Sequence, residues 1–345
     1  MKKFLLLALA FALGSSSLAV SGAFADSTTT TVSGTSSTTT SVPTTSTTVK
    51  AGPVAPLTGL PDPSRLTKHR AALTIKIDNT PEAMPQYGIE DADVVYEEIV
   101  EGGITRLAAI FNSQLPAQVG PVRSVRRTDR EIVFPIRGIF AFSGGAEYAV
   151  RSIETAPVKL FDEFNSGAAM FRDSQRYAPH NLFANAALLM KMDKNPERPQ
   201  SLFPYSSAKG KPSGAPVSSF VVGFANGFAT SYAWNSKTTS WDRSIFGKPD
   251  VTANGAHISP KNVIVMTVHY VGGVGVIDSY AELIGSGPVE VFTRGTLQRG
   301  TWSRRDLRQP TVYRSASGNV INMRPGPTWV ELLDVSEHVS VTLAP

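Results

Sequence analysis

Charged residues inside an otherwise apolar run, residues 92–111, are the strongest chemical signal in this sequence. Glu97, Glu98 and Arg106 lie there among residues that are typical of buried strands. A buried carboxylate must be paired, hydrogen-bonded or placed at the rim of a cavity. A partly desolvated carboxyl group is also the general acid of glycoside hydrolysis, so Glu97 and Glu98 are candidate catalytic residues.

The glycine pair Gly102-Gly103 predicts a two-residue hairpin turn, because both central positions of such a turn require positive φ. In that register Arg106 shares a face with Glu97 and is its natural counter-ion, while Glu98 points to the opposite, more apolar face. The two neighbouring glutamates therefore cannot act as a catalytic pair. A structural ion pair and a functional site both stay open as interpretations.

An arginine-rich segment follows, with Arg123, Arg126, Arg127 and Arg130 close together. With Ser124 as the helix N-cap, helical spacing would place three of these arginines on one stripe. Guanidinium groups suit carboxylates and phosphates, so Arg106, Arg123, Arg126 and Arg127 are candidate ligand-binding residues. A solvated basic face is the alternative.

A second polar cluster occupies the predicted loop at residues 171–182. It contains Arg172, Asp173, His180 and Asn181. His180 is a candidate general acid or base, and the other three are candidate ligand contacts. A histidine satisfied within the structure is the alternative interpretation.

Several kinds of chemistry are excluded or not predicted. The sequence has no cysteine, which removes thiolate metal sites and a cysteine nucleophile. His257 and His269 lack metal-ligand spacing with acidic residues, so no metal and no cofactor are expected. A Gly-x-Ser-x-Gly motif and the glycine patterns of nucleotide-binding loops do not occur.

The elements that must position these residues follow from hydrophobic periodicity. Strands are predicted at residues 73–77 and 139–142, and helices at 146–154 and from Asn185. Short strands with glycine turns then dominate, and the four tryptophans are better explained by a β core than by sugar stacking. The predicted fold class is α+β: an N-terminal mixed α/β domain around a central β-hairpin, followed by a smaller β-rich C-terminal domain.

The chain ends and composition predict an exported protein. Residues 1–25 have the three parts of a signal peptide, and residues 26–54 are a Ser/Thr-rich tether. The mixed domain is placed at 55–205, a linker at 206–215 and the β-rich domain at 216–345. Removing Lys2 and Lys3 lowers the formal charge from +5 to +3 (5 − 2), too little to predict nucleic-acid binding.

The expected location is secreted and wall-associated. No second apolar run long enough to span a bilayer follows the signal. Because cysteine is absent, no lipid anchor is expected.

Several motifs in a fixed order resemble the YerB-like family of bacterial envelope proteins, and the likeness covers essentially residues 56–334. The motifs are Pro56-Leu-Thr-Gly-Leu-Pro61, Ile77-Asp-Asn79, Ala92-Asp-Val-Val-Tyr-Glu97, Val100-Glu-Gly-Gly-Ile-Thr-Arg106, Gly120-Pro-Val-Arg-Ser-Val-Arg126, Phe171-Arg-Asp173, Ala178-Pro-His-Asn-Leu182, Lys261-Asn-Val-Ile-Val265, Gly300-Thr-Trp302 and Pro325-Gly-Pro-Thr-Trp329. The resemblance implies an exported location and a two-part fold of unknown function. It supplies no established catalytic residues.

Two functions are compatible with these observations. The first is a cell-envelope protein that binds a wall glycan, an anionic wall polymer or a peptide carboxylate in an Arg/Glu/His-lined cleft. The alternative is a glycan-cleaving enzyme that uses a glutamate general acid. Glu97 and Glu101 would lie roughly 13 Å apart along a strand, beyond the about 5 to 9.5 Å that separates catalytic carboxylates. A second carboxylate would then come from Glu147 or Asp173.

Overall fold

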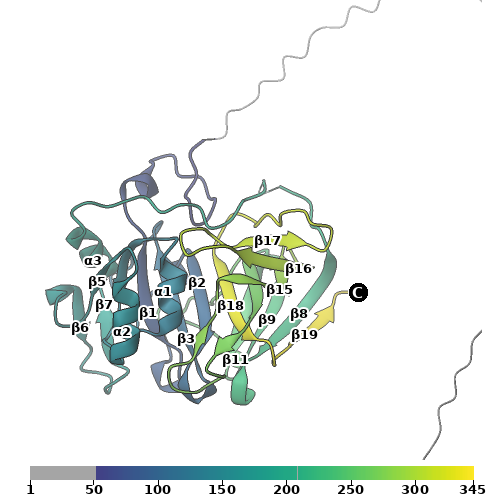
Figure 1. The fold of residues 1–345 in the computed structure, drawn as a ribbon. Coiled ribbons are helices and arrows are strands. Elements are labelled where there is room, and N and C mark those ends of the chain that lie inside the picture. The colour runs from purple at the N-terminus through teal and green to yellow at the C-terminus, as the bar shows by residue number, and fades with distance from the viewer. Residues whose placement is uncertain (1–51, 208) are drawn as a thin grey trace, which may run out of the picture. The chain divides into compact units, whose positions relative to one another are not determined.

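A mixed β-sheet organises the structure, which is a computed structural model and describes residues 52–207 and 209–345 (Figure 1). The predicted signal peptide and nearly all of the predicted tether lie outside the described residues. The described residues belong to one compact unit.

The first part of the chain supplies one end of the sheet. Its strands lie in the order β2-β3-β1-β4-β5, antiparallel across β2, β3 and β1 and parallel across β1, β4 and β5. Their bounds are β1 Leu73–Asp78, β2 Val94–Ile99, β3 Thr105–Phe111, β4 Gly138–Ala141 and β5 Val158–Phe161. Strands β1, β2 and β3 are buried along their whole length, which explains their nearly continuous apolar sequence.

Helices cover both faces of these strands. Helices α1 (Arg127–Val133) and α2 (Glu147–Glu154) pack against one face, and α3 (Ala186–Met192) packs against the other. The predicted helices at 146–154 and from Asn185 are confirmed, and the Asn185 side chain accepts a hydrogen bond from Leu188 N, as expected of an N-cap. A small ribbon, β6 (Met170–Arg172) with β7 (Leu182–Ala184), frames the polar loop between them.

The remaining chain is rich in strands, so the predicted α+β class is confirmed. The large strands are β8 Ala215–Gly223, β9 Ala229–Asn235, β10 Ser240–Ile245, β12 Asn262–Val268, β15 Gly285–Thr293, β16 Thr296–Arg304, β18 Thr328–Asp334 and β19 Val339–Leu343. The short ones are β11 Lys248–Pro249, β13 Tyr270–Val271, β14 Tyr280–Ala281 and β17 Val312–Ser315. Single-turn 3-10 helices are η1 Leu66–His69, η2 Pro81–Ala83, η3 Ile89–Asp91, η4 Glu101–Gly103, η5 Gly167–Ala169 and η6 Ala225–Gly227. Trp241, Trp302 and Trp329 are buried, as the β-core interpretation predicts.

Strand β18 joins the two parts of the sheet. It lies parallel between β12 and β2, with Thr328 opposite Val94 and Leu332 opposite Glu98, and Figure 1 shows it in yellow beside the blue β2. One strand from near the C-terminus therefore completes the sheet around the hairpin. The domain boundary at 206–215 stays a prediction.

Candidate functional site

The hairpin turn decides where the charged residues point, and the predicted two-residue turn is wrong. Gly102 and Gly103 do have positive φ, but the loop is three residues long and is closed by Val100 N bonding to Ile104 O. The register therefore slips by one, and Glu98, not Glu97, lies opposite Arg106. A slip of one residue moves a whole strand face to the other side of the sheet.

Glu98 belongs to a buried ion-pair network. Lys76 on β1 contacts both Glu98 and Asp129, with 2.8 Å between Lys76 Nζ and Asp129 Oδ1. All three side chains are buried, and Asp129 also accepts a hydrogen bond from Arg126 N at the start of α1. Burial raises the pKa of Asp129 to about 6. These contacts link β1, β2 and α1.

Glu97 belongs to a second buried network on the opposite face. Arg243 Nη2 lies 2.7 Å from Glu97 Oε2, and the same guanidinium pairs with Asp250. Asn79 and Thr105 donate to the other Glu97 oxygen at 3.0 and 2.6 Å. The predicted counter-ion Arg106 is therefore wrong for Glu97, and its partner Arg243 comes from the β-rich part of the chain.

Three of the predicted ligand-binding arginines gather at the ends of β1 and β3. Arg106 bonds to Ser124 O at 3.3 Å, and Arg126 bonds through Nη2 to Glu101 at 2.6 Å. Arg123 forms an ion pair with Asp78, with 2.9 Å between Nε and Oδ2. We refer to Arg106, Arg123 and Arg126 as the arginine cluster.

The positive charge of Arg106 is only partly compensated by the surrounding carboxylates and hydrogen-bond acceptors. Its side chain is only 6% exposed, and Nε is buried without a hydrogen-bond partner among the described residues. Burial, together with Arg126 and Arg123, lowers the pKa of Arg106 to about 10. Burial alone would raise the pKa of Glu101, but hydrogen bonding from Arg126 lowers it. The Glu101 carboxylate is therefore kept ionised beside the cluster.

His180 lies beside the arginine cluster through a shared carboxylate. Its Nδ1 is 2.7 Å from Asp78 Oδ2, the same oxygen that Arg123 contacts. Thr80 Oγ1 lies 3.5 Å from the same ring nitrogen. An aspartate at Nδ1 orients a histidine ring and leaves Nε2 as the nitrogen available to a ligand.

The other predicted site residues lie elsewhere. Arg172 pairs with Glu163 and Asn181 on an exposed surface, and Asp173 caps a turn by accepting from Gln175 N. Arg127 pairs with Asp278 and lies over the Tyr280 ring at 4.2 Å.

The predicted arginine stripe on one helix is also wrong, because α1 begins only after its cap residue Arg126. Arg123 therefore lies in the extended segment before the helix, where its backbone N–H donates a hydrogen bond to the backbone carbonyl oxygen of Lys76.

The sequence interpretation missed three important residues. The first is Asp78, which also forms a turn by accepting a hydrogen bond from Thr80 N at 3.3 Å. The second is Lys76, which stands between Ile75 and Ile77, and a lone cation in such an apolar strand is itself a signal of a buried carboxylate partner. The third is Arg243, whose neighbours Asp242 and Ser244 are polar, so its strand gives no such signal.

Two family models match the chain. The N-terminal domain of "Protein of unknown function (DUF3048)" matches residues 57–198, and the C-terminal domain of the same family matches residues 220–330. Together they cover 253 of 345 residues (142 + 111).

A relative and a solved structure agree with that match. "Putative lipoprotein YerB" of Bacillus subtilis is 26% identical over 302 residues, which cover 84% of this chain and 88% of the relative. The crystal structure of YerB protein from Bacillus subtilis superposes with a TM-score of 0.72 at 24% identity, covering 83% of this chain and 99% of that one. The structural likeness shows a shared fold.

The expectation of no lipid anchor is contradicted by that relative, whose name describes a lipoprotein. The expectation rested only on the absence of cysteine, and we withdraw it. An extracytoplasmic location is consistent with the relative's name. Over the residues that the structure describes, no helix is long and apolar enough to cross a membrane.

Proposed function

Because the chain belongs to the DUF3048 family of proteins of unknown function, we propose a role from its own side chains. The protein is an extracytoplasmic binding protein, and it holds an anionic group of a cell-envelope ligand at the arginine cluster. The ligand is a wall glycan, an anionic wall polymer or a peptide carboxylate.

The observation that carries this proposal is the buried, unpartnered Nε of Arg106. Three guanidinium groups face the carboxylates of Asp78 and Glu101, while the cross-strand Glu98 is paired with Lys76. A buried cation without a complete set of acceptors costs free energy. An anion bound there would accept those hydrogen bonds and reduce the repulsion among the arginines.

The surrounding residues suit reversible binding. The side chains of Arg123 and Arg126 are 21% and 14% exposed, so their guanidinium groups reach solvent from a partly buried position. Such groups bind anions more strongly than fully solvated ones because less water screens them. His180, 20% exposed and oriented by Asp78, adds a ring nitrogen that can donate or accept.

The experiment compares purified protein on wall preparations that carry their anionic polymers and on the same preparations after those polymers are extracted. Wild-type protein is expected to bind the first at low salt and to bind less at moderate salt. Arg106→Gln and Arg123→Gln should each weaken binding at least about tenfold, equivalent to about 1.4 kcal/mol.

Arg151→Gln is the matched control, since Arg151 is exposed on α2 and, among the residues that the structure describes, forms an ion pair with Glu147 alone. It should bind like the wild type. Equal losses in all three variants would mean that net charge alone drives adsorption, and the proposal would then be abandoned.

The glycan-cleaving alternative has no specific contact in its favour. Glu97 and Glu98 each form an ion pair with a buried cation, on opposite faces of the hairpin. The hypothesis stays testable: wall digestion by the wild type that disappears in a folded Glu98→Gln variant would revive it.

A further inference from the structure

A groove in the β-rich part of the chain lies apart from the arginine cluster and shares no lining residue with it. The groove forms where β16 changes partners: β8 pairs with it at Thr296 and Leu297, and β17 pairs with it from Gly300 to Ser303. Gln298 and Arg299 lie between those two partners. The space between the start of β8 and the loop after β17 has a volume of about 690 Å³, within the range of about 300 to 1,000 Å³ that is usual for small-ligand sites.

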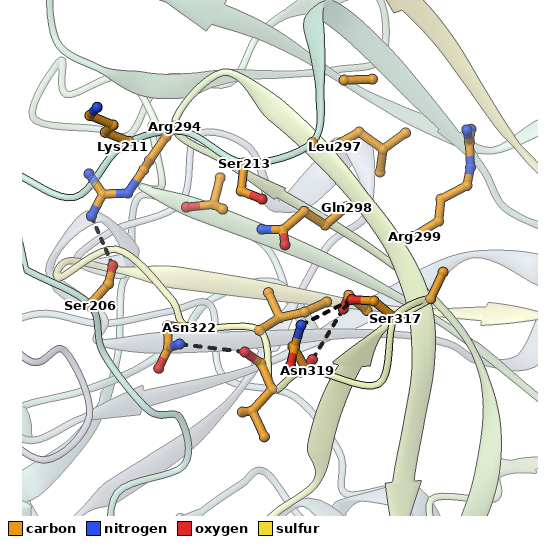
Figure 2. A pocket seen from close by; sticks show the side chains of 17 residues that line it. Ser206, Lys211, Ser213, Arg294, Leu297, Gln298, Arg299, Ser317, Asn319 and Asn322 are labelled. Carbon is orange, nitrogen blue, oxygen red and sulfur yellow. Dashed lines mark hydrogen bonds between the residues drawn. The ribbon is translucent and has the colours of Figure 1, made fainter. Parts of the chain in front are cut away.

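The lining of this groove has a consistent chemistry. Figure 2 shows Gln298 between Arg294 and Lys211 on one side and Asn319 on the other, with Arg299 at the far end. Several serine hydroxyls complete the polar wall. Among the described residues that line the groove, none is acidic and three are cationic: Lys211, Arg294 and Arg299, the last of which pairs with Glu290 outside the lining.

Part of this hydrogen-bonding capacity is available. Lys211 is exposed and has no ion-pair or hydrogen-bond partner among the described residues. Within the described part of the chain, Arg299 bonds to Glu290 through Nε alone, which leaves its terminal nitrogens for other acceptors. Over residues 52–207 and 209–345, the Asn322 side-chain amide makes a single long bond, of 3.4 Å to Val320 O.

The floor of the groove is apolar. Leu297 and Ile321 are 3% and 2% exposed, and they lie beneath the polar wall. Sugar rings present C–H faces as well as hydroxyl edges, so an apolar floor with amide and hydroxyl walls suits a carbohydrate better than a bare inorganic anion. The charge of Lys211, together with that of Arg299, whose ion pair with Glu290 uses Nε, favours a ligand with negative charge.

We propose that this groove is a second binding site, which takes an acidic carbohydrate chain. Its carboxylates pair with Lys211 and the two arginines, and its hydroxyls bond to Gln298, Asn319 and Asn322. This inference does not depend on the function proposed for the arginine cluster.

The test is isothermal titration calorimetry of the purified protein with oligogalacturonate, an acidic sugar chain. Neutral malto-oligosaccharide of equal length and inorganic polyphosphate are the comparison probes. Oligogalacturonate should bind at least about tenfold more tightly than either, because only it offers both charge and hydroxyls. Absence of oligogalacturonate binding, or equal affinity for polyphosphate, would overturn the proposal.

Charge-reversal variants test whether the sugar chain binds in the groove. Lys211→Glu should weaken oligogalacturonate binding about tenfold or more at low salt. Lys248→Glu makes the same charge change on an exposed lysine of β11, outside the groove, and should change affinity less than about twofold. Equal losses in these two variants would show non-specific attraction and contradict the groove assignment.

Arg123→Gln separates the two proposals. It alters the arginine cluster and leaves the groove intact, so oligogalacturonate affinity should stay unchanged. A parallel loss would mean that the sugar chain binds at the arginine cluster, which would overturn the second site.

Discussion

Lys76 is the cation that two buried carboxyl groups share. Its one ammonium group contacts both Glu98 and Asp129, and all three side chains are buried. A buried charge that loses its partner is far more costly than the pair itself is stabilising. The network is therefore a structural element that holds α1 against β1 and β2.

Lys76→Met should lower the free energy of unfolding by about 3 to 5 kcal/mol, because two carboxylates lose their cation. Urea denaturation followed by circular dichroism measures the change. Lys191→Met, at an exposed lysine of α3, is the control and should change stability by less than about 0.5 kcal/mol. A small effect at Lys76 would show that water or protonation compensates the carboxylates.

Glu331 is a buried carboxyl group whose stability effect depends on pH. Burial and the nearby Glu97 raise its pKa well above the usual range, and Tyr232 donates a hydrogen bond to it. Below the unfolded-state pKa of about 4.3 both states hold the proton. Above it the unfolded state releases the proton and the folded state retains it, so this group costs stability as pH rises.

Glu331→Gln should therefore become more stable relative to wild type as pH rises from 4 to 7. Glutamine keeps an acceptor for Tyr232 and has no proton to retain. Thermal unfolding of both proteins across that pH range measures the difference. A difference that stays constant with pH would show that Glu331 is ionised in the folded protein.

Arg106 should show opposite effects on stability and binding. Removing an under-compensated buried cation relieves repulsion with Arg123 and Arg126, so Arg106→Gln is expected to raise the melting temperature while it weakens ligand binding. Differential scanning calorimetry gives the first quantity and the wall-binding assay gives the second. A fall in melting temperature would show that Arg106 is a structural residue.

At the scale of elements, hydrophobic periodicity predicted the strands and helices well, but the glycine pair predicted the wrong loop length for the hairpin. Two glycines with positive φ are compatible with both a two-residue and a three-residue loop. The longer loop is held by Gly102 N bonding to Gly275 O and by Asn226 Nδ2 bonding to Gly102 O. Both partners are more than 120 residues away in sequence, so local analysis could not include them.

The one-residue change in the hairpin register explains most of the difference between the predicted and the observed contacts of the candidate site residues. Arg106 stays a predicted ligand-binding residue, but the strand face on which it was placed followed from the register, and a one-residue change moved it away from Glu97. Arg243, the actual partner of Glu97, required knowledge that β10 approaches the hairpin. His180 and Arg123 come together only because both contact Asp78.

The two turn glycines should differ in their tolerance of alanine. A Cβ on Gly102 would contact no neighbouring atom among the described residues. Gly102→Ala should therefore lower the free energy of unfolding by about 1 kcal/mol, the cost of a positive φ in alanine. A Cβ on Gly103 would lie 2.4 Å from Asn226 Nδ2 and would displace its hydrogen bond to Gly102, which adds about another 1 kcal/mol. Urea titrations that give equal costs would contradict this view of the loop.

At the scale of the molecule, β18 makes the hairpin depend on the far end of the sequence. Without it, β2 would be an open edge with unpaired backbone groups along a buried, apolar strand. A fragment of residues 55–205 is therefore expected to bind a hydrophobic dye and to lack a cooperative urea transition. The intact chain should unfold in one transition when followed by both tryptophan fluorescence and circular dichroism. A fragment with its own sharp transition would show that the predicted domain folds alone.

The position of β18 also sets an order of events during synthesis. The end of β2 at residue 99 and the start of β18 at residue 328 are 229 residues apart in sequence (328 − 99). At about 5 to 20 residues per second, the ribosome needs roughly 11 to 46 s to make them. For that interval the nascent hairpin has an unpaired edge, so the chain must either be kept unfolded or be shielded by a chaperone until its last tenth has been made.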